Sequence, residues 1–366
     1  MIKSLATGKV LVGIETLTTV GHVMSLMHKF YPFIDTPFVV FDFTGISYAK
    51  SIATAVFARE LREVLFYRNE RRLITKANIK IKTDVTCRYL DHMGFFDFIG
   101  VQHKGDLKSV RHRIEQQIEG RIPIIEYGYL YFQRGTGYDP MDGLITYDQA
   151  EGSASDIIET ESVKIVEALF GKIGGNEVLA YCVRESIRNC YEHSRADKYY
   201  VFGQTWNNGK SELVIMDYGD GLLKTLKKKY PELLDEKSAI IKATEPGVSE
   251  ADFTGKNRYE NSGFGLYVLC QLAQRFGRLY IASNGTMVEY GKNGSVFKMR
   301  SKGTMVALQF RKMPDDFGAT LGEIIEEGRQ VAKTGQYPIS PSLLTKQYIK
   351  NGTNRIVGNK PSASNQ

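Results

Sequence analysis

Hydrophobic positions in the first hundred residues form short continuous runs that alternate with helix-spaced stripes. Residues 38–43 are a nearly continuous apolar run, which is typical of a strand buried on both faces. Residues 52–67 carry apolar side chains at helical spacing, and Ser51 stands in the N-cap position. Strand, helix, strand and helix in this order predict an α/β unit with parallel strands. The other elements expected here are strands at 9–14 and 79–81 and helices at 20–30 and 88–99, the last broken at Gly94.

A second amphipathic helix is expected around residues 178–193. Glu185, Asn189 and His193 recur every fourth residue, so on a helix they form one stripe along the border of its apolar arc. A carboxylate, an amide and an imidazole in line beside a core face can wall a pocket, or can simply be the polar flank of a helix. The arc opposite the apolar one holds Arg184, Arg188, Glu192 and Arg195.

Alternating apolar and polar positions follow this helix. Residues 199–205 and 212–216 read as two strands, and the sequence N-N-G-K between them is a hairpin signal. The second strand runs into D-Y-G-D-G at 217–221. Its two glycines would let a flat ligand approach the backbone, and Asp217 could accept a hydrogen bond from an exocyclic amine. On its own this turn is a weak signal, because many strands end this way.

The next stretch is polar and then becomes helical again. Residues 245–261 lack apolar periodicity and are expected to form a loop that closes over a ligand. The sequence N-S-G-F-G-L at 261–266 then opens a helix, whose free N–H groups suit a phosphate chain. Further expected elements are helices at 155–170, 222–234, 239–244 and 318–333, strands at 279–283, 295–300 and 305–310, and a disordered tail from about Gly352.

These elements divide the chain into four parts. We expect an α/β domain at 1–103, a connector at 104–155, a second domain at 156–313, and a C-terminal helix with its tail at 314–366. Within the connector, residues 134–143 are rich in turn formers but meet neither phosphate-loop nor calcium-loop spacing, so we expect a loop.

Composition narrows the function classes. The formal net charge is +7, yet the basic clusters at 68–82, 224–229 and 298–302 are spread along the chain, and nucleic acid is not an expected partner. No apolar run approaches the ~20 residues that span a bilayer, and the N-terminus lacks the pattern of a secretory signal. Four cysteines without paired spacing fit a reducing cytoplasm. Cys190 and His193 have no second ligand pair, so zinc is not expected.

Four motifs occur in one order across about 120 residues: E-x-x-x-N-x-x-x-H, D-x-G-x-G, N-x-G-x-G-L and G-T. Together they resemble the ATP-binding module of the GHKL superfamily, which includes gyrase B, heat-shock chaperones, histidine kinases, MutL and the anti-sigma factor serine kinases. The resemblance implies an α/β sandwich in which a mixed sheet is covered on one face by helices. It also implies ATP and Mg²⁺ as cofactors.

The same resemblance assigns roles to individual residues. Asn189 would ligate Mg²⁺ between the phosphates, and Glu185 would act as general base. Asp217 would bind the adenine amine with support from Thr304. A histidine one turn beyond the asparagine, as at His193, recurs in the anti-sigma branch. The alternative is that His193 is a hydrogen-bonded histidine packed in the core. The glycines and their neighbours expected to contact the base or the phosphates are Gly219, Gly221, Asn261, Gly263, Gly265 and Leu266.

The N-terminal part resembles a STAS domain over about residues 10–103. The segment V-V-F-D-F-T-G-I-S-Y-A-K-S matches at Asp42 and Ser51 and departs at Lys50 and Ala53, and R-Y-L-D-H-M-G-F-F resembles the final helix of that family. The resemblance implies an interaction or scaffold module. Ser51 would then be either a phosphorylation site or no more than a helix cap.

Three functions are open on this basis. The first is an enzyme of the anti-sigma kinase-like branch, which hydrolyses ATP or transfers phosphate to a protein serine or threonine in bacterial regulation. The second is a nucleotide-gated switch that recruits a protein partner through the N-terminal part. The third is a GHKL fold that binds no nucleotide. A histidine kinase is disfavoured because His112 lacks a following acidic residue, and a gyrase-like protein because no room remains for a transducer domain. Homodimer formation stays open.

Overall fold

The computed structural model describes residues 2–5, 8–101, 121–128, 138–139, 143–144, 158–159, 162–167, 169, 176–196, 198–206, 208–249, 263–291, 294–311 and 316–332. Several expectations lie outside these residues. They concern Asn261, most of the loop at 245–261, most of the turn-rich loop at 134–143, His112 and the C-terminal tail.

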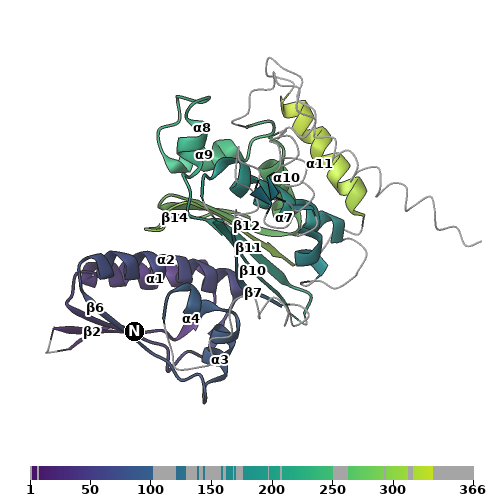
Figure 1. Ribbon diagram of the computed structural model, residues 1–366. Helices are drawn as coiled ribbons and strands as arrows, with labels where there is room; N and C mark the ends of the chain where they lie inside the picture. The colour runs from purple at the N-terminus through teal and green to yellow at the C-terminus, as the bar shows by residue number, and fades with distance from the viewer. Residues whose placement is uncertain are drawn as a thin grey trace, which may run out of the picture.

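The N-terminal unit, described over residues 2–101, is built on a four-stranded sheet (Figure 1). β2, β4 and β6 are parallel, as expected, and β1 adds an antiparallel edge. Gly94, with φ of 75°, separates α3 from α4 at the predicted break. The sheet order is β1 (Ile2–Leu5), β2 (Lys9–Gly13), β4 (Phe38–Asp42) and β6 (Ile74–Asn78). The other elements are β3 (Thr16–Leu17), α1 (Val20–Phe30), η1 (Tyr31–Phe33), β5 (Tyr48–Ala49), α2 (Ser51–Glu70), α3 (Val85–His92) and α4 (Phe95–Phe98).

Two expectations for this unit are wrong. The third parallel strand is β6, not residues 79–81, because an edge strand needs no continuous apolar run and this one alternates exposed and half-buried residues. Ser51 does not cap α2. It is the first residue of the helix, and its Oγ is buried and has no hydrogen-bond partner among the described residues. The N–H of Ile52 is bonded instead to a carboxylate from the other half of the chain, Glu212.

The C-terminal unit is built on a seven-stranded sheet in which every neighbouring pair is antiparallel. The chain combines helices with two main sheets, so the α/β class is confirmed. The resemblance implied a mixed sheet in this unit, whereas the mixed sheet is the four-stranded one of the N-terminal unit. The predicted hairpin is present, with Gly209 at φ of 75° in its turn. The strand order is β14 (Val296–Lys298), β13 (Thr286–Tyr290), β12 (Gly277–Ser283), β15 (Thr304–Phe310), β11 (Ser211–Asp217), β10 (Lys198–Thr205) and β7 (Arg121–Gly128).

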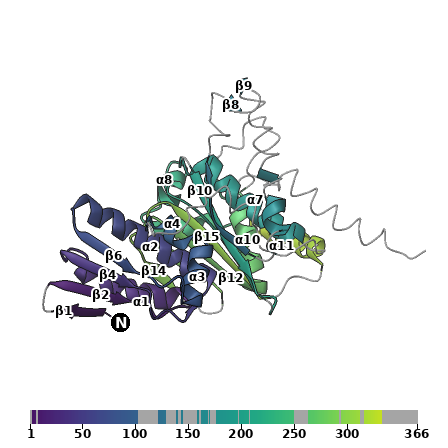
Figure 2. The ribbon, with the colours of Figure 1, turned by 60° about the horizontal axis from the view of Figure 1, so that its bottom comes forward.

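Two of these strands were not anticipated. β7 comes from the stretch expected to be a connector, and it pairs with β10 at the edge of the sheet. β13 lies between two predicted strands and pairs with β12 through the turn at Asn284 and Gly285. A short two-stranded pairing also joins β8 (Tyr138–Asp139) to β9 (Gly143–Leu144), visible at the top of Figure 2.

Helices of the C-terminal unit cover one face of this sheet. They are α7 (Asn176–His193), α10 (Gly265–Phe276) and α11 (Phe317–Ala332), and the described residues between 158 and 169 are also helical. α8 (Leu222–Leu226) and α9 (Glu236–Ala243) lie at one end of the sheet. α8 ends at Leu226, which is earlier than the interruption expected at Pro231 in the helix predicted at 222–234.

The helices of the C-terminal unit cover one face of the sheet, as the resemblance implied, and the N-terminal unit covers the opposite face. Figures 1 and 2 show α2 lying across this face, on the side away from α7 and α10. Along β11, Leu213 and Ile215 pack with the C-terminal helices, whereas Val214 and Met216 belong to the same core as α1 and α2. One continuous core therefore joins the two sheets.

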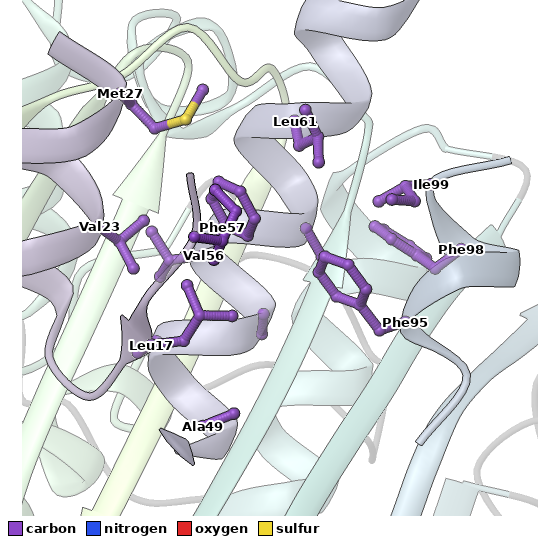
Figure 3. Close-up of a cluster of buried hydrophobic side chains, with 14 of the residues drawn as sticks. Leu17, Val23, Met27, Ala49, Val56, Phe57, Leu61, Phe95, Phe98 and Ile99 are labelled. Atoms are coloured by element: carbon purple, nitrogen blue, oxygen red, sulfur yellow. The ribbon is translucent and has the colours of Figure 1, made fainter. Parts of the chain in front are cut away.

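Aromatic side chains fill the centre of that core on the α2 side (Figure 3). Phe57 of α2 and Phe95 of α4 stack with ring centroids 6.0 Å apart and an interplanar angle of 10°. Phe43, at the end of β4, meets Phe95 and Phe96 edge-on. These aromatic contacts pack one side of α2 against α4 and the end of β4. The other side of α2 packs against the seven-stranded sheet.

Candidate functional site

A cavity opens in the C-terminal unit at the end of the sheet where α7, α8, α9 and α10 meet. It contains about 70 Å³ of space accessible to water. Its walls combine apolar side chains with polar groups from five separate segments. Of the residues singled out from the sequence, eight line it: Asn189, His193, Asp217, Gly221, Gly263, Gly265, Leu266 and Thr304. Residues more than a hundred positions apart are thus brought together as predicted.

Asp217 lies on the floor of the cavity and is 1% exposed. Its Oδ1 accepts the backbone N–H groups of Gly219, at 2.7 Å, and Thr304, at 3.2 Å. Neither bond uses Oδ2. Burial raises the pKa of Asp217 above its usual range, and the two N–H groups and Arg59 work against that rise. The side chain is a buried acceptor held in place by the backbone.

Glycine is required at two positions around this carboxylate. A Cβ on Gly219 would lie 1.9 Å from the carbonyl oxygen of Ser194, and a Cβ on Gly303 would lie 2.3 Å from that of Asp217. Gly303 also has φ of 74°, in the left-handed region. The sequence predicted that Gly219 would leave room for a flat ligand. The space that a side chain would need there is filled by Ser194 instead, and Gly219 does not line the cavity.

Asn189 and His193 lie on the stretch of α7 that faces the cavity, and both are half-buried. Among the described residues, no group of three or more His, Cys, Asp or Glu side chains is placed to hold a metal ion. The amide oxygen of Asn189 is a donor that Mg²⁺ could take together with a bound ligand, since this ion commonly takes one or two protein oxygens and completes its shell with phosphate oxygens and water.

Glu185 does not line the cavity, unlike the other two members of its stripe. It is buried, and its Oε1 accepts a hydrogen bond from Nη2 of Arg184 at 2.6 Å. The same oxygen forms an ion pair with Nη1 of Arg188 at 4.0 Å. Its Oε2 would be 2.7 Å from a Cβ on Gly265. The carboxylate therefore lies directly behind the start of α10. Arg184 and Arg188 are buried too, so this part of the arc opposite the apolar one is not a solvent face, whereas Arg195, just after α7, is exposed.

The start of α10 contributes the glycines on the far wall. Gly263 has φ of 67°, and its carbonyl oxygen accepts the N–H of Gly247 at 3.1 Å. A Cβ on Gly263 would approach the backbone of Gly247 and Val248 to 2.6–2.7 Å. This contact ties the end of the segment after α9 to the beginning of α10.

Several residues of the site were missed from the sequence. Cys190 lines the cavity with Asp217, and burial together with the negative charge of that carboxylate raises the pKa of its thiol well above the usual range. Asn284 holds the turn, since Nδ2 donates to the carbonyl of Asp220 at 2.8 Å and Oδ1 accepts the N–H of Gly303 at 2.8 Å. From the sequence, Cys190 is considered only as a zinc ligand beside His193, and Asn284 belongs to none of the four motifs, so neither carried a signal for this role.

A third missed residue comes from the N-terminal unit. Arg59 of α2 donates to the carbonyl oxygens of Asp217, at 3.1 Å, and Thr304, at 2.8 Å, and also to that of Lys302. No local pattern could assign this charged side chain to a site that begins more than a hundred residues later.

Comparisons with protein-family models, with curated proteins and with solved structures returned no match. Among the described residues, no helix is long and apolar enough to cross a membrane.

Proposed function

We propose that this chain binds Mg²⁺-ATP in the cavity, as a nucleotide-binding protein of the GHKL type with a STAS-like N-terminal unit. The observation that carries the proposal is Asp217: a buried carboxylate on the cavity floor, held through Oδ1 by two backbone N–H groups. A buried acceptor in a mostly apolar pocket suits a flat base that presents an amine. Asn189 and the glycine-rich start of α10 lie on other walls, where the phosphates and Mg²⁺ would be held.

The size of the cavity sets a condition on this proposal. Small-molecule sites usually enclose roughly 300–1,000 Å³, and about 70 Å³ is well below that range. A nucleotide therefore requires the walls to move apart. Val248 and Ser249, which follow α9, lie outside helices and strands, as do Ser194, Gly221 and Gly263 of the same lining.

The chain could either turn over the bound nucleotide or only bind it, and the role of Glu185 distinguishes these two functions. As a general base, Glu185 would orient water or a protein hydroxyl for attack on the γ-phosphate, giving ATP hydrolysis or phosphoryl transfer to serine or threonine in a regulatory role. Its ion pair with Arg184 instead favours the second candidate, a switch that binds ATP without turnover and recruits a protein partner through the N-terminal unit.

The nucleotide proposal is tested by base selectivity. Inosine triphosphate replaces the exocyclic amine of ATP by a carbonyl, which a carboxylate at Asp217 would repel. By calorimetry with Mg²⁺, the wild type should bind ATP at least ten-fold more tightly than inosine triphosphate, since leaving a buried acceptor unpaired costs about 1–3 kcal/mol. Asp217→Asn should remove that preference. The matched control is Asp220→Asn, because Asp220 is in the same turn but pairs with Lys224 and Arg195 and does not line the cavity.

Turnover is then measured on Glu185→Gln, which keeps the shape of the side chain. A steady-state ATPase assay and a transfer assay with labelled γ-phosphate should both drop if Glu185 is the base. Equal turnover in wild type and variant, with unchanged ATP affinity, would favour the switch. Absence of any ATP binding by the wild type would reject both candidates.

A further inference from the structure

α2 brings a buried arginine against the back of the cavity. Arg59 is completely buried, and its guanidinium reaches three carbonyl oxygens of the C-terminal unit: those of Asp217, Lys302 and Thr304. Asp217 and Thr304 are the residues whose side chain and N–H form the floor of the candidate site, and Lys302 immediately precedes Gly303. The same guanidinium therefore ties the end of β11 to the beginning of β15.

The charge of Arg59 also faces the site. Its guanidinium donates to three neutral carbonyls and lies 5.3 Å from the ring centroid of Tyr218, and its positive charge acts on the carboxylate of Asp217. In a buried setting a charge acts over several ångströms with little screening. Arg59 thus supports Asp217 in two ways, by fixing the backbone of the turn and by favouring the ionised carboxylate.

Neighbouring residues hold α2 in register on the sheet. The carboxylate of Glu60 accepts the N–H groups of Arg300, at 2.9 Å, and Ser301, at 2.8 Å. Near the start of the helix, Glu212 of β11 accepts the N–H of Ile52 at 2.8 Å. Hydrogen bonds that involve charged groups cross the contact in both directions, so α2 cannot slide along the sheet without leaving buried charges unpaired.

We propose that Arg59 is a positioning residue for Asp217, so that the N-terminal unit sets the base selectivity of the cavity. This inference rests on the proposed function and adds its regulation. Docking of α2 and binding of an amine-bearing base stabilise the same arrangement of Asp217, Gly303 and Thr304. The two events are therefore coupled, and by linkage a ligand in the cavity tightens the docking of the N-terminal unit to the same extent.

The chain offers a matched control. Arg68 is also on α2 and also completely buried, and it donates to the carbonyls of Ile34, Thr36 and Ile74 and to the hydroxyl of Thr75. All of these acceptors belong to the N-terminal unit. Arg59→Met and Arg68→Met therefore make the same chemical change on the same helix, and both remove buried bonds, but only the first removes bonds to the candidate site.

The experiment compares wild type, Arg59→Met, Arg59→Lys and Arg68→Met at full length. Calorimetry with Mg²⁺ and either ATP or inosine triphosphate gives the ratio of the two affinities. We expect Arg59→Met to weaken ATP at least ten-fold and to bring the ratio close to one. Arg59→Lys keeps the charge, so it should lose less ATP affinity and less base selectivity than Arg59→Met does. Arg68→Met should lower the melting temperature while the ratio stays that of the wild type. An unchanged ratio in Arg59→Met, or an equal loss in Arg68→Met, would overturn the proposal.

A second measurement needs no nucleotide. Hydrogen exchange followed by mass spectrometry reports the N–H groups of Gly219 and Thr304, which bond to Asp217. Exchange in peptides that contain them should be faster in Arg59→Met and in Arg59→Lys than in Arg68→Met. If the wild type binds no ATP but this difference is present, the proposed function fails and the positioning role stands. If Arg59→Met does not fold, Arg59→Lys tests the positioning role alone. Exchange rates and base selectivity equal to those of the wild type in Arg59→Lys would then reject that role.

Discussion

The carboxylate of Glu212 accepts the backbone N–H of Ile52 at 2.8 Å, although the two residues are 160 positions apart. A strand of one unit therefore provides the N-terminal cap for the long helix of the other. The second oxygen of Glu212 receives Nε2 of Gln309 at 2.7 Å, and the side chain is 3% exposed. The N–H of Ile52, in the first turn of α2, thus depends on the docked sheet for its partner.

Removal of this cap should destabilise the whole chain. We expect Glu212→Ala to lower the free energy of unfolding by about 2 kcal/mol, since it removes the cap and leaves Gln309 without its partner. Glu212→Gln keeps an oxygen acceptor and should cost less. Urea denaturation followed by circular dichroism measures both. A loss in Glu212→Ala no greater than that of the exposed change Glu232→Ala would contradict this role.

Glu212 should also make stability depend on pH. Burial raises its pKa, so the folded chain binds this proton more readily than the unfolded chain does. The contribution to stability is therefore fully present below the usual carboxyl pKa and is lost as the pH rises through the raised value. Glu212→Gln cannot titrate, so its stability relative to wild type should improve between pH 4 and pH 7. Denaturant midpoints at several pH values check this, with Glu232→Gln, at an exposed site, as the control.

Gly303 should tolerate no side chain. In Gly303→Ala the new Cβ meets the backbone of Asp217 and Tyr218, and the left-handed φ adds strain. A cost of roughly 2–5 kcal/mol is expected from these two effects together. Gly45→Ala is the control, since a Cβ there would have open space. Thermal unfolding of the two variants at equal concentration makes the comparison, and equal melting temperatures would refute the role of Gly303.

Glu185 and Arg184 form a buried ion pair, so their contributions to the free energy of unfolding should be coupled. Glu185→Ala removes the nearer carboxylate partner of the buried Arg184 guanidinium and leaves Glu159 at 3.8 Å, so a cost of about 3 kcal/mol is expected. The double change Glu185→Ala with Arg184→Met removes this poorly compensated buried charge and should recover part of that loss. A double-mutant cycle from urea denaturation gives the coupling, and simple additivity would mean that the pair does not act as a unit.

Local patterns predicted most of the elements. The helix Val20–Phe30 begins and ends where its apolar spacing placed it, and the hairpin at Gly209 follows from its turn residues. The same patterns brought Asn189, Asp217 and Gly265 to one cavity, because each motif stands at the end of an element. What failed depended on distant partners. The cap at Ile52 comes from Glu212, and the edge strand β6 needs pairing on one side only.

Charged residues in the core were the least predictable. Arg59, Glu60 and Arg184 are buried in positions where the periodicity of a helix permits either a core or a surface face. Their partners are backbone groups or neighbouring charges rather than apolar surfaces, so hydrophobic spacing carries no information about them. Both the coupling between the units and the confinement of Glu185 rest on such groups.

The shared core has a consequence for synthesis. α2 ends at Glu70, whereas β15, against which it packs, ends at Phe310. At translation rates of ~5–20 residues per second, the ribosome takes about 10–50 s to make the intervening chain. Until β11 and β15 are both made, the side of α2 that carries Arg59 and Glu60 lacks its full set of partners on the sheet. The nascent N-terminal unit therefore exposes a charged surface while most of the following chain is translated, and molecular chaperones would have their longest opportunity there.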